Sequence, residues 1–484
     1  MFVGRRKELS LLEEAYTSKK GELVVIYGRR RIGKSCLVQN FTQGKKNVFS
    51  FEALENETTQ KQITHFAQQL QKQTNDPLLG SVDLKKWENL FYYLTERTLA
   101  LLPENNGREK TVLFFDEFQW MAVGRSRLVS LLKFFWDNFW KEKNIMLILC
   151  GSIASFMVKK VLRSKALYGR TTLEILLKGL NPTDSLSLLQ HRRSNEETIK
   201  YIMVFGGVPK YLEQINTNQS FNQNMNQLCF SSQGIMVHEV DRIFYNQFRQ
   251  AKTYLRIVNL LENRIHSMGE ISEKLKIPSG GGLKLYLDNL ELAEIIRSYT
   301  PLDRSETSKF KKYMLCDEYL LFYFKYIKPN IKTINESTSK KKFETLTGDS
   351  FNSWLGFSFE RFCLKYSGAL ARIMNFEDEV LLASPFFGRN DKKFQIDLIY
   401  KRADKVITIC EIKHQNKKIS TKIIPEMERK CSLFNAPRGY VVEKALISLY
   451  GPDESLKNAE YFHHIVTLGD IFKNISIKGY QVTL

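Results

Sequence analysis

The chain has 484 residues, a formal net charge of +20 and a hydrophobic share of 43%. This length is too great for one ordinary core and predicts three or four domains, and the hydrophobic share is that of a globular protein. The basic excess favours contact with a polyanion such as nucleic acid, because binding releases phosphate counterions. A generally basic proteome is the alternative explanation of the charge.

The cysteines and the apolar runs exclude several classes of protein. There are seven cysteines, and none forms a C-x-x-C pair. Cys36, Cys150 and Cys410 lie inside apolar runs and are predicted to be small core residues, so structural disulfides and a zinc site are not expected. Charged residues stand where a signal peptide needs an apolar region, and no run reaches the roughly 18 apolar residues of a membrane span. The sequence therefore predicts a soluble cytoplasmic protein.

The first predicted elements surround a phosphate-binding loop. A short turn and an amphipathic helix precede an apolar run, residues 22–27, which has the character of a buried strand. Residues 28–35 read G-R-R-R-I-G-K-S, and helical spacing follows. Strand, loop and helix aim backbone N–H groups, the helix dipole, Lys34 and Ser35 at one point, which can hold ATP and its Mg²⁺. The predicted nucleotide-binding residues are Gly28, Arg29, Arg30, Arg31, Ile32, Gly33, Lys34, Ser35 and Cys36.

Two later strands carry the polar groups that such a loop requires. Residues 111–115 are apolar and are followed by Asp116 and Glu117. Asp116 is predicted to hold Mg²⁺ opposite Ser35, and Glu117 to polarise the water that attacks the γ-phosphate. Two acids that merely end a strand are the alternative. A further strand, residues 144–152, ends in Ser152, which is either a sensor of the γ-phosphate or an ordinary strand-end serine.

The rest of the first half predicts an α/β architecture. Residues 47–52 form another probable strand, residues 54–110 a polar helical insertion, and residues 128–140 an aromatic helix that serves packing. Strands that alternate with helices predict a parallel sheet covered on both faces, with its sites at the carboxyl ends of the strands.

The middle of the chain is predicted to be helical and then to form a helix-turn-helix with a wing. Residues 183–247 carry a helical pattern, and residues 332–342 are the best linker candidate. Between them, residues 250–328 suit three helices followed by a hairpin of residues 295–299 and 311–315. The third helix is not strongly basic, which weakens direct reading of the major groove and leaves protein as an alternative partner.

A second chemical pattern lies in the last part of the chain. Two apolar strands, residues 394–400 and 406–413, are joined by a polar turn. Pairing that is symmetric about residue 404 places Asp397 opposite Glu411, with Lys413 on the same face. The two acids can hold Mg²⁺, and the lysine can steady a water or the transition-state charge in phosphodiester hydrolysis. A cross-strand charge set on a solvated face is the alternative, and Glu360 on the preceding helix is a candidate extra acid.

At this point the chain resembles the archaeal-type ATPases that carry a C-terminal restriction-endonuclease-like domain. The resemblance spans nearly the whole sequence and rests on several motifs in the same order. These motifs are residues 2–6, 28–35, 114–119, 150–152, 167–170, 206–212 and 317–323. The resemblance implies an AAA-like ATPase related to signal-transduction ATPases, with a five-strand core, a helical lid and a winged helix. The expected fold is thus α/β multidomain, with a P-loop parallel sheet and an α/β tail similar to the PD-(D/E)xK nucleases.

The resemblance also implies roles for individual residues. Pro209, with Gly207, would contact the adenine or close the lid, although a helix C-cap would also explain Gly206 and Gly207. Arg170 would read the γ-phosphate, although a surface arginine is the alternative. Asp397, Glu411 and Lys413 occupy the nuclease motif positions, where Ile396 replaces the frequent proline. The expected domains are residues 1–180 (ATPase core), 181–248 (lid), 249–330 (winged helix) and 331–484 (nuclease-like).

The sequence therefore predicts an ATP hydrolase that uses ATP and Mg²⁺ and whose nucleotide state controls the winged helix and a metal-dependent DNA nuclease. The alternative is a regulatory ATPase switch whose catalytically silent tail binds DNA or protein, and Glu117 speaks against a non-hydrolysing sensor. DNA is the expected partner, a protein partner and an oligomer are allowed, and no membrane is expected. The predicted catalytic residues are Glu117, Arg170, Asp397, Glu411 and Lys413. The predicted metal ligands are Ser35, Asp116, Asp397 and Glu411.

Overall fold

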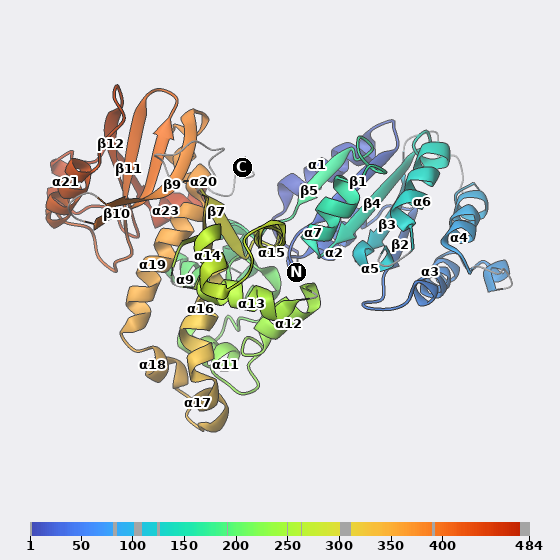
Figure 1. Ribbon diagram of the computed structural model, residues 1–484, viewed down its shortest axis with the longest axis horizontal. Helices are drawn as coiled ribbons and strands as arrows, with labels where there is room; N and C mark the ends of the chain where they lie inside the picture. The colour runs from blue at the N-terminus through green and yellow to red at the C-terminus, as the bar shows by residue number, and fades with distance from the viewer. Residues whose placement is uncertain are drawn as a thin grey trace. The chain divides into compact units, whose positions relative to one another are not determined.

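The chain folds into two compact units, each described here by itself. The computed structural model describes residues 2–80, 85–100, 109–122, 126–190, 192–248, 250–262, 264–300, 311–389 and 393–474. The first unit ends at Lys178 and the second begins at Gly179 (Figure 1). In these described ranges, no helix has the length and apolarity needed to cross a bilayer.

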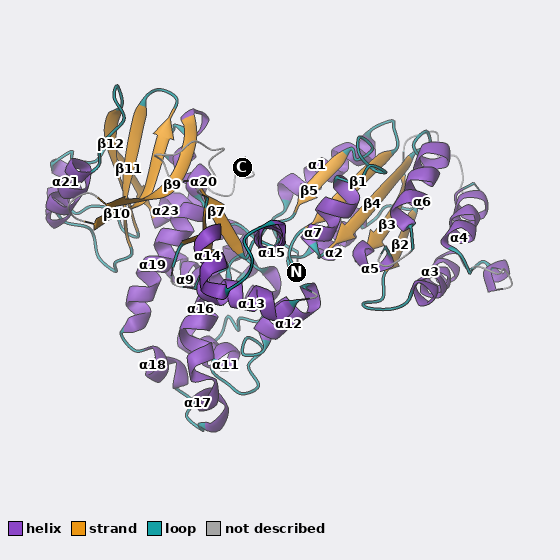
Figure 2. Ribbon diagram, in the orientation of Figure 1, coloured by secondary structure: helices purple, strands orange, loops and turns teal. Residues whose placement is uncertain are grey.

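A five-stranded parallel sheet forms the centre of the first unit (Figure 2). Its spatial order is β2-β3-β4-β1-β5. The strands are β1 (Glu22–Tyr27), β2 (Val48–Glu52), β3 (Thr111–Asp116), β4 (Ile145–Gly151) and β5 (Leu173–Leu176). The first four confirm the strands predicted along the chain. The short β5 was not predicted from its own residues, and only the resemblance implied a fifth strand.

Helices precede and follow the strands of this sheet and bury its faces. They are α1 (Arg6–Thr17), α2 (Lys34–Thr42), α3 (Thr59–Thr74), α4 (Trp87–Tyr93), α5 (Phe118–Met121), α6 (Leu128–Phe135) and α7 (Ala154–Phe156). The aromatic run that begins in α6 is a packing element, as predicted. The ring of Phe135 lies 5.4 Å from that of Phe91 and 5.7 Å from that of Trp140, and Trp140 Nε1 donates to Thr95 Oγ1 over 3.0 Å.

The second unit begins with helices and a small antiparallel sheet. The helices are α8 (Pro182–Leu188), α9 (Asn195–Phe205), α10 (Pro209–Leu212), α11 (Phe221–Cys229), α12 (Glu239–Gln247), α13 (Ala251–Leu260), α14 (Met268–Leu275) and α15 (Gly281–Leu292). The sheet has the order β6-β8-β7, from β6 (His266–Ser267), β7 (Ile296–Tyr299) and β8 (Lys312–Leu315). The predicted hairpin appears as β7 and β8, whereas β6 was missed. The tip of the predicted wing, residues 301–310, lies outside the described residues.

The segment predicted as a linker is structured instead. It follows α16 (Glu318–Phe322) and contains α17 (Ile331–Glu336) and the start of α18 (Lys342–Thr347). The Lys342 ammonium donates to the carbonyl of Ile334 over 2.8 Å. Two further bonds tie α18 to Asn226 of α11, one to the Phe343 N–H and one to Glu344. Most side chains of residues 332–341 are exposed, so a polar composition is compatible with this short helical segment as well as with a linker.

A second five-stranded sheet, of mixed direction, forms the C-terminal part of this unit. Its order is β13-β12-β11-β10-β9; β9, β10 and β11 pair antiparallel, and β11, β12 and β13 pair parallel. The strands are β9 (Val380–Arg389), β10 (Lys393–Arg402), β11 (Val406–Lys413), β12 (Val441–Ser448) and β13 (His464–Thr467). The helices are α19 (Ser350–Lys365), α20 (Ser367–Ile373), α21 (Ile424–Leu433), α22 (Glu454–Asn458) and α23 (Leu468–Asn474).

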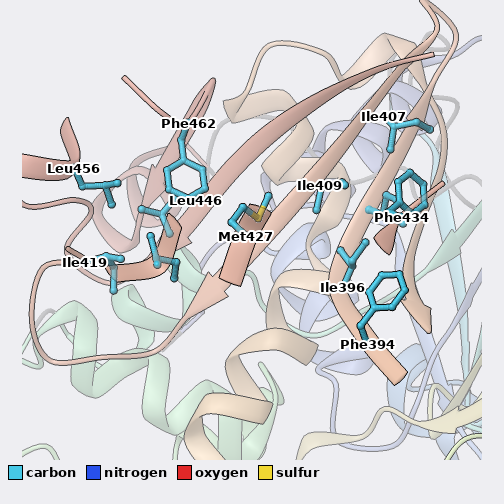
Figure 3. Packing of buried hydrophobic residues seen from close by; sticks show 12 residues of the cluster. Phe394, Ile396, Ile407, Ile409, Ile419, Met427, Phe434, Leu446, Leu456 and Phe462 are labelled. Carbon is cyan, nitrogen blue, oxygen red and sulfur yellow. The ribbon is translucent and has the colours of Figure 1, made fainter. Parts of the chain in front are cut away.

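Helix α21 covers one face of this sheet and buries an apolar cluster. Figure 3 shows Met427 of α21 among Ile396, Ile409 and Leu446 of three neighbouring strands. All four side chains are fully buried or nearly so. On the helix, Met427 and Lys430 are three residues apart and both buried, so Lys430 lies on the face that packs against the sheet.

At the junction between α9 and α10, the backbone leaves no space for a side chain on Gly207. Gly206 caps α9, and its N–H donates to the carbonyl of Ile202, as the C-cap alternative for this pair expected. A Cβ on Gly207 would lie 2.0 Å from the carbonyl oxygen of Leu180 and 2.9 Å from its nitrogen. Both atoms are backbone and cannot rotate away.

Replacing Gly207 by alanine is therefore expected to destabilise the second unit, by about 1–3 kcal/mol as for overpacking. Gly356, inside α19, is a matched control because a Cβ there meets nothing within 4 Å. Gly356→Ala should raise stability by up to about 1 kcal/mol, since alanine is the better helix former. Thermal unfolding midpoints of the two variants test this, and equal or higher stability of Gly207→Ala would contradict it.

Candidate functional site

The phosphate-binding loop joins β1 to α2. Gly33, directly before α2, has φ +91, a left-handed conformation that glycine adopts without strain. The Lys34 side chain is buried, and its ammonium donates to the carbonyls of Gly28 over 3.2 Å and Arg29 over 3.1 Å. The loop thus holds its lysine inward, over its own backbone, where the phosphates of a nucleotide are expected.

A residue outside the predicted set also supports the loop. The guanidinium of Arg5 is buried and donates to the carbonyl of Ile32 over 3.0 Å. Arg5 had been noted only as part of a start motif, and its position 27 residues before its partner hides this contact from local patterns. Within the loop, Arg30 forms an exposed ion pair with Glu55 at 3.3 Å, and Cys36 is exposed, so the prediction of Cys36 as a core residue was wrong. Cys150 and Cys410 are buried as predicted, and all seven cysteines are free thiols.

Asp116 ends β3 beside the loop. Its carboxyl is buried and accepts hydrogen bonds from the Ser35 hydroxyl and from the N–H of Glu117, the latter over 2.9 Å. Burial raises the pKa of Asp116 above its usual value, and the bond from Ser35 acts in the opposite direction. The structure therefore brings together the two groups predicted to hold Mg²⁺, a hydroxyl and a carboxylate, which are oxygen donors that suit this ion.

Glu117 and Ser152 meet at the ends of two neighbouring strands. Ser152 follows β4, and its hydroxyl donates to Glu117 Oε2 over 2.7 Å. Glu117 itself has φ +50, which is unusual for a residue other than glycine and typical of functional turns. The predicted water-polarising acid and the predicted sensor are thus in direct contact.

Gln119 completes this group and was not predicted as a site residue. Its amide nitrogen donates to Glu117 Oε2 and, over 3.1 Å, to Ser152 Oγ. Its side chain is fully buried, and its amide oxygen has no hydrogen-bond partner among the described residues. A polar residue two positions after Glu117, on the short α5, was the available signal. Such an orphaned acceptor next to Glu117 suits a site that takes a further polar ligand.

The other two predicted nucleotide contacts are Arg170 and Pro209. The guanidinium of Arg170 makes a two-point ion pair with Asp137, at 2.7 and 2.9 Å, and this pair holds the pKa of Asp137 below its usual value. Arg170 is therefore engaged by an acid that follows α6. Pro209 is the first residue of α10 in the second unit, where its fixed φ suits a helix start.

The second predicted site lies on β10 and β11. The register of β10 and β11 pairs Leu398 with Cys410, and one more step of it places Asp397 opposite Glu411, as predicted. Beside β9, β10 carries one extra residue between Ile396 and Ile399, so a bulge lies at Asp397. Bulges of this kind redirect a side chain and often stand next to active sites.

Glu411 is fully buried and is held between two lysines. Its Oε1 lies 2.7 Å from the Lys413 ammonium, and its Oε2 accepts from the Lys430 ammonium over 2.7 Å. Lys430 belongs to α21 and was not predicted. A lysine on the apolar face of an amphipathic helix was the signal that could have found it, because a buried ammonium needs an acid.

The acids and lysines of this site shift one another's pKa values. Burial raises the pKa of Asp397, and the positive charge of Lys430 opposes this rise. Burial, together with the negative charge of Asp397, raises the pKa of Glu360 to about 7, which shows that the extra acid of α19 lies near the strand pair. Burial alone would lower the pKa of Lys413, but the neighbouring Glu411 raises it above its usual value.

The donor set of this site fits a hard cation only in part. Asp397 and Glu411 supply carboxylate oxygens, but both oxygens of Glu411 already lie 2.7 Å from a lysine ammonium. Carboxylate oxygens are ligands that Mg²⁺ prefers, but a metal ion here would compete with Lys413 and Lys430 for the Glu411 carboxylate. The same part of the chain holds no group of three or more His, Cys, Asp or Glu side chains arranged to bind a metal. Two acids and two lysines thus stand where a metal-dependent nuclease was predicted.

Comparisons with known proteins agree with the first of these sites. Residues 2–215 match a family model described as an ATPase domain predominantly from Archaea. Residues 323–424 match a model of archaeal and bacterial proteins of unknown function. An uncharacterized protein of Methanocaldococcus jannaschii is 28% identical over 437 residues, which cover 90% of this chain and 92% of that protein. An uncharacterized ATP-binding protein of the same organism is 46% identical over 46 residues, which cover 10% of this chain and 78% of that protein.

Two solved structures show weaker similarity. A Walker-type ATPase of Pyrococcus abyssi is 18% identical, with a TM-score of 0.48, and the match covers 67% of this chain and 96% of that one. The ORC2 protein of Aeropyrum pernix is 14% identical, with a TM-score of 0.40, and the match covers 68% and 93% of the two chains. Residues 2–215 are thus similar to the predominantly archaeal ATPase domains, and residues 323–424 are similar to the second family.

Proposed function

We propose that this chain binds and hydrolyses ATP and that its nucleotide state controls a metal-dependent nuclease in its C-terminal part. The observation that carries the ATPase is the pair of contacts at the sheet edge, Asp116 with Ser35 and Glu117 with Ser152. The matched ATPase family supports the same activity. The proposed domains are residues 1–180, 181–248, 249–330 and 331–484, in a cytoplasmic protein that can form oligomers.

In this proposal each residue of the ATP site has one task. The loop backbone, residues 28–36, and Lys34 bind the phosphates, and Ser35 and Asp116 would hold Mg²⁺, which when bound neutralises charge on the β- and γ-phosphates. Glu117 accepts the proton of the attacking water, and its bond from Ser152 fixes the carboxylate in place. Pro209 of the lid would approach the adenine, and Arg170 would read the γ-phosphate after leaving Asp137.

In the C-terminal part, Asp397 and Glu411 would hold the metal ion and Lys413 would stabilise the charge that develops on the cleaved phosphate. The support is their convergence on a bulged, buried strand pair. Helices α13–α15 and the sheet β6-β8-β7 suit a winged helix, which would contact DNA or a protein partner.

Contacts within the second unit give nucleotide-dependent movement a route to the nuclease-like part. The Lys365 ammonium of α19 donates to Glu318 of α16 over 2.5 Å, and Arg297 of β7 donates to the carbonyl of Leu364 over 3.3 Å. The other carboxylate oxygen of Glu318 lies so close to Gly206 that a Cβ there would be 2.6 Å away. The proposed lid, winged helix and nuclease-like part are thus linked through packed groups, which is a physical basis for coupling.

The experiment that tests this proposal measures cleavage of plasmid and single-stranded DNA with Mg²⁺ or Mn²⁺, with and without ATP. It compares the native chain with Lys34→Ala, in which the phosphates lose their ammonium partner. Nucleotide control is supported if cleavage by the native chain depends on ATP and cleavage by Lys34→Ala does not. If both proteins cleave DNA equally with and without ATP, the nucleotide does not control the nuclease.

A second candidate function is a regulatory ATPase switch whose tail binds DNA or protein without cutting. The observation in its favour is that both oxygens of Glu411 already face lysines, so that the charge of the acid is compensated by the chain itself. ATP hydrolysis without cleavage by the native chain would favour this alternative.

A further inference from the structure

A pocket opens beside the acids of the C-terminal part, and both of its walls belong to the second unit. Its volume is about 320 Å³. One wall includes residues 261, 262, 264 and 265 together with Met314 and Leu315 of β8, and the other comes from α19, β9 and β10. Glu360 and Asp397 are part of the second wall, so the pocket leads to the carboxylates of the proposed nuclease site.

Two exposed phenylalanines line this pocket. Phe357 of α19 is 58% exposed and Phe387 of β9 is 45% exposed, although both residues are large and apolar. Neither helix packing nor sheet packing accounts for them, since α19 and β9 bury other residues. Exposed aromatic rings next to a polar site are the platforms on which nucleic-acid bases stack, because every base has a π-face.

Each wall of the pocket also carries an arginine. Arg264 is exposed and stands on the first wall, and Arg361 is partly exposed on α19 beside Glu360. A guanidinium binds phosphate in a planar, two-point fashion, and the chain as a whole carries a net charge of +20. Aromatic rings supply stacking and arginines supply phosphate contacts, which is the combination that recognises an unpaired strand.

The size of the pocket selects among nucleic-acid substrates. A volume of about 320 Å³ is at the lower end of the ~300–1,000 Å³ of small-molecule sites. A base that stays paired and stacked in a duplex cannot enter a pocket of this size, whereas one unpaired nucleotide can. Asp397 would therefore be reached by a strand end or an unpaired base.

We propose that this pocket binds single-stranded DNA, with bases stacked on Phe357 and Phe387 and the backbone phosphates on Arg264 and Arg361. The strand would lie with one phosphate next to Asp397. This inference names the substrate class of the proposed nuclease and rests on that function, but the binding itself requires neither metal nor cleavage.

The test measures binding of a fluorescent 20-nucleotide DNA strand to the full chain by anisotropy, in EDTA, so that no cleavage takes place. The native chain is expected to bind the single strand more tightly than the duplex of the same sequence. Phe357→Ala and Phe387→Ala should each weaken binding by between about 5- and 150-fold, the effect of losing one stacked base. A conservative Phe357→Tyr variant should retain binding, because a tyrosine ring stacks as well.

Leu381 provides the matched control. It lies on the same strand as Phe387, is 55% exposed and does not line the pocket, so Leu381→Ala should bind as the native chain does. Tighter binding of the duplex or of an RNA strand, or phenylalanine variants that bind like Leu381→Ala, would overturn the proposal. If binding depends on the phenylalanines but the chain shows no metal-dependent cleavage, the proposal of single-strand binding stands and the proposed nuclease activity does not.

Discussion

A Glu117→Gln variant is expected to bind ATP as tightly as the native chain and to hydrolyse it about 10²–10⁴ times more slowly, the usual contribution of a positioned general base. Glutamine keeps the size of the side chain and can still receive the hydrogen bond from Ser152, so the strand ends stay in place. It cannot accept the proton of the attacking water. Single-turnover hydrolysis and the Kd of a fluorescent ATP analogue measure the two effects separately.

Glu52 offers a control in the same sheet. It ends β2 in register with Asp116, so it stands at the same sheet edge, but its side chain is exposed and outside the group formed by Glu117, Ser152 and Gln119. Glu52→Gln should hydrolyse ATP at the native rate. Equal losses in the two variants would show that the rate depends on the charge of the edge as a whole, and unchanged hydrolysis in Glu117→Gln would remove its role as base.

Most of the ATP site was predictable because its signals are local. A Gly-bounded loop between an apolar run and a helix specifies its own geometry, and two acids after an apolar run specify a strand end. The meeting of Glu117 with Ser152 followed from parallel strands, whose carboxyl ends share one edge. Arg5 was missed because it acts through a tertiary contact that no sequence spacing announces, and Gln119 because its place two residues after Glu117 does not reveal its contact with Ser152.

The strand register of the C-terminal site was predictable from the sequence, but the two lysines that surround Glu411 were not both predictable. Pairing about residue 404 follows from a short polar turn between two apolar strands, and the structure has that register. The bulge at Asp397 depends on how β9 aligns, and the lysine opposite Glu411 comes from a helix that follows the strand pair. The linker prediction was wrong for a different reason: the polar side chains of residues 332–341 are mostly exposed, as their composition indicates, but part of the segment is helical and leads directly into α18.

Replacing Glu411 by glutamine is expected to abolish metal-dependent cleavage and to destabilise the C-terminal part. The carboxylate compensates two ammonium groups at 2.7 Å, Lys413 and the buried Lys430, and its removal leaves the buried one without its acid. Breaking a buried ion pair by removing one partner costs about 3–5 kcal/mol. Cleavage and thermal unfolding of the full chain must therefore be measured together, since a loss of activity alone has two causes.

Two further variants separate those causes. Glu443→Gln on the neighbouring strand breaks another ion pair of the same sheet, with Arg402 at 2.8 Å, and should cost stability without loss of cleavage. Lys430→Met removes a positive charge beside Glu411 and Asp397, so it should strengthen binding of Mn²⁺, measured by calorimetry, if the acids are metal ligands. If Lys430→Met binds no Mn²⁺ and Glu411→Gln loses only stability, the acids exist to hold the two lysines. The C-terminal part would then be the catalytically silent tail of an ATPase switch, because acids that hold lysines and bind no metal ion cannot support metal-dependent cleavage.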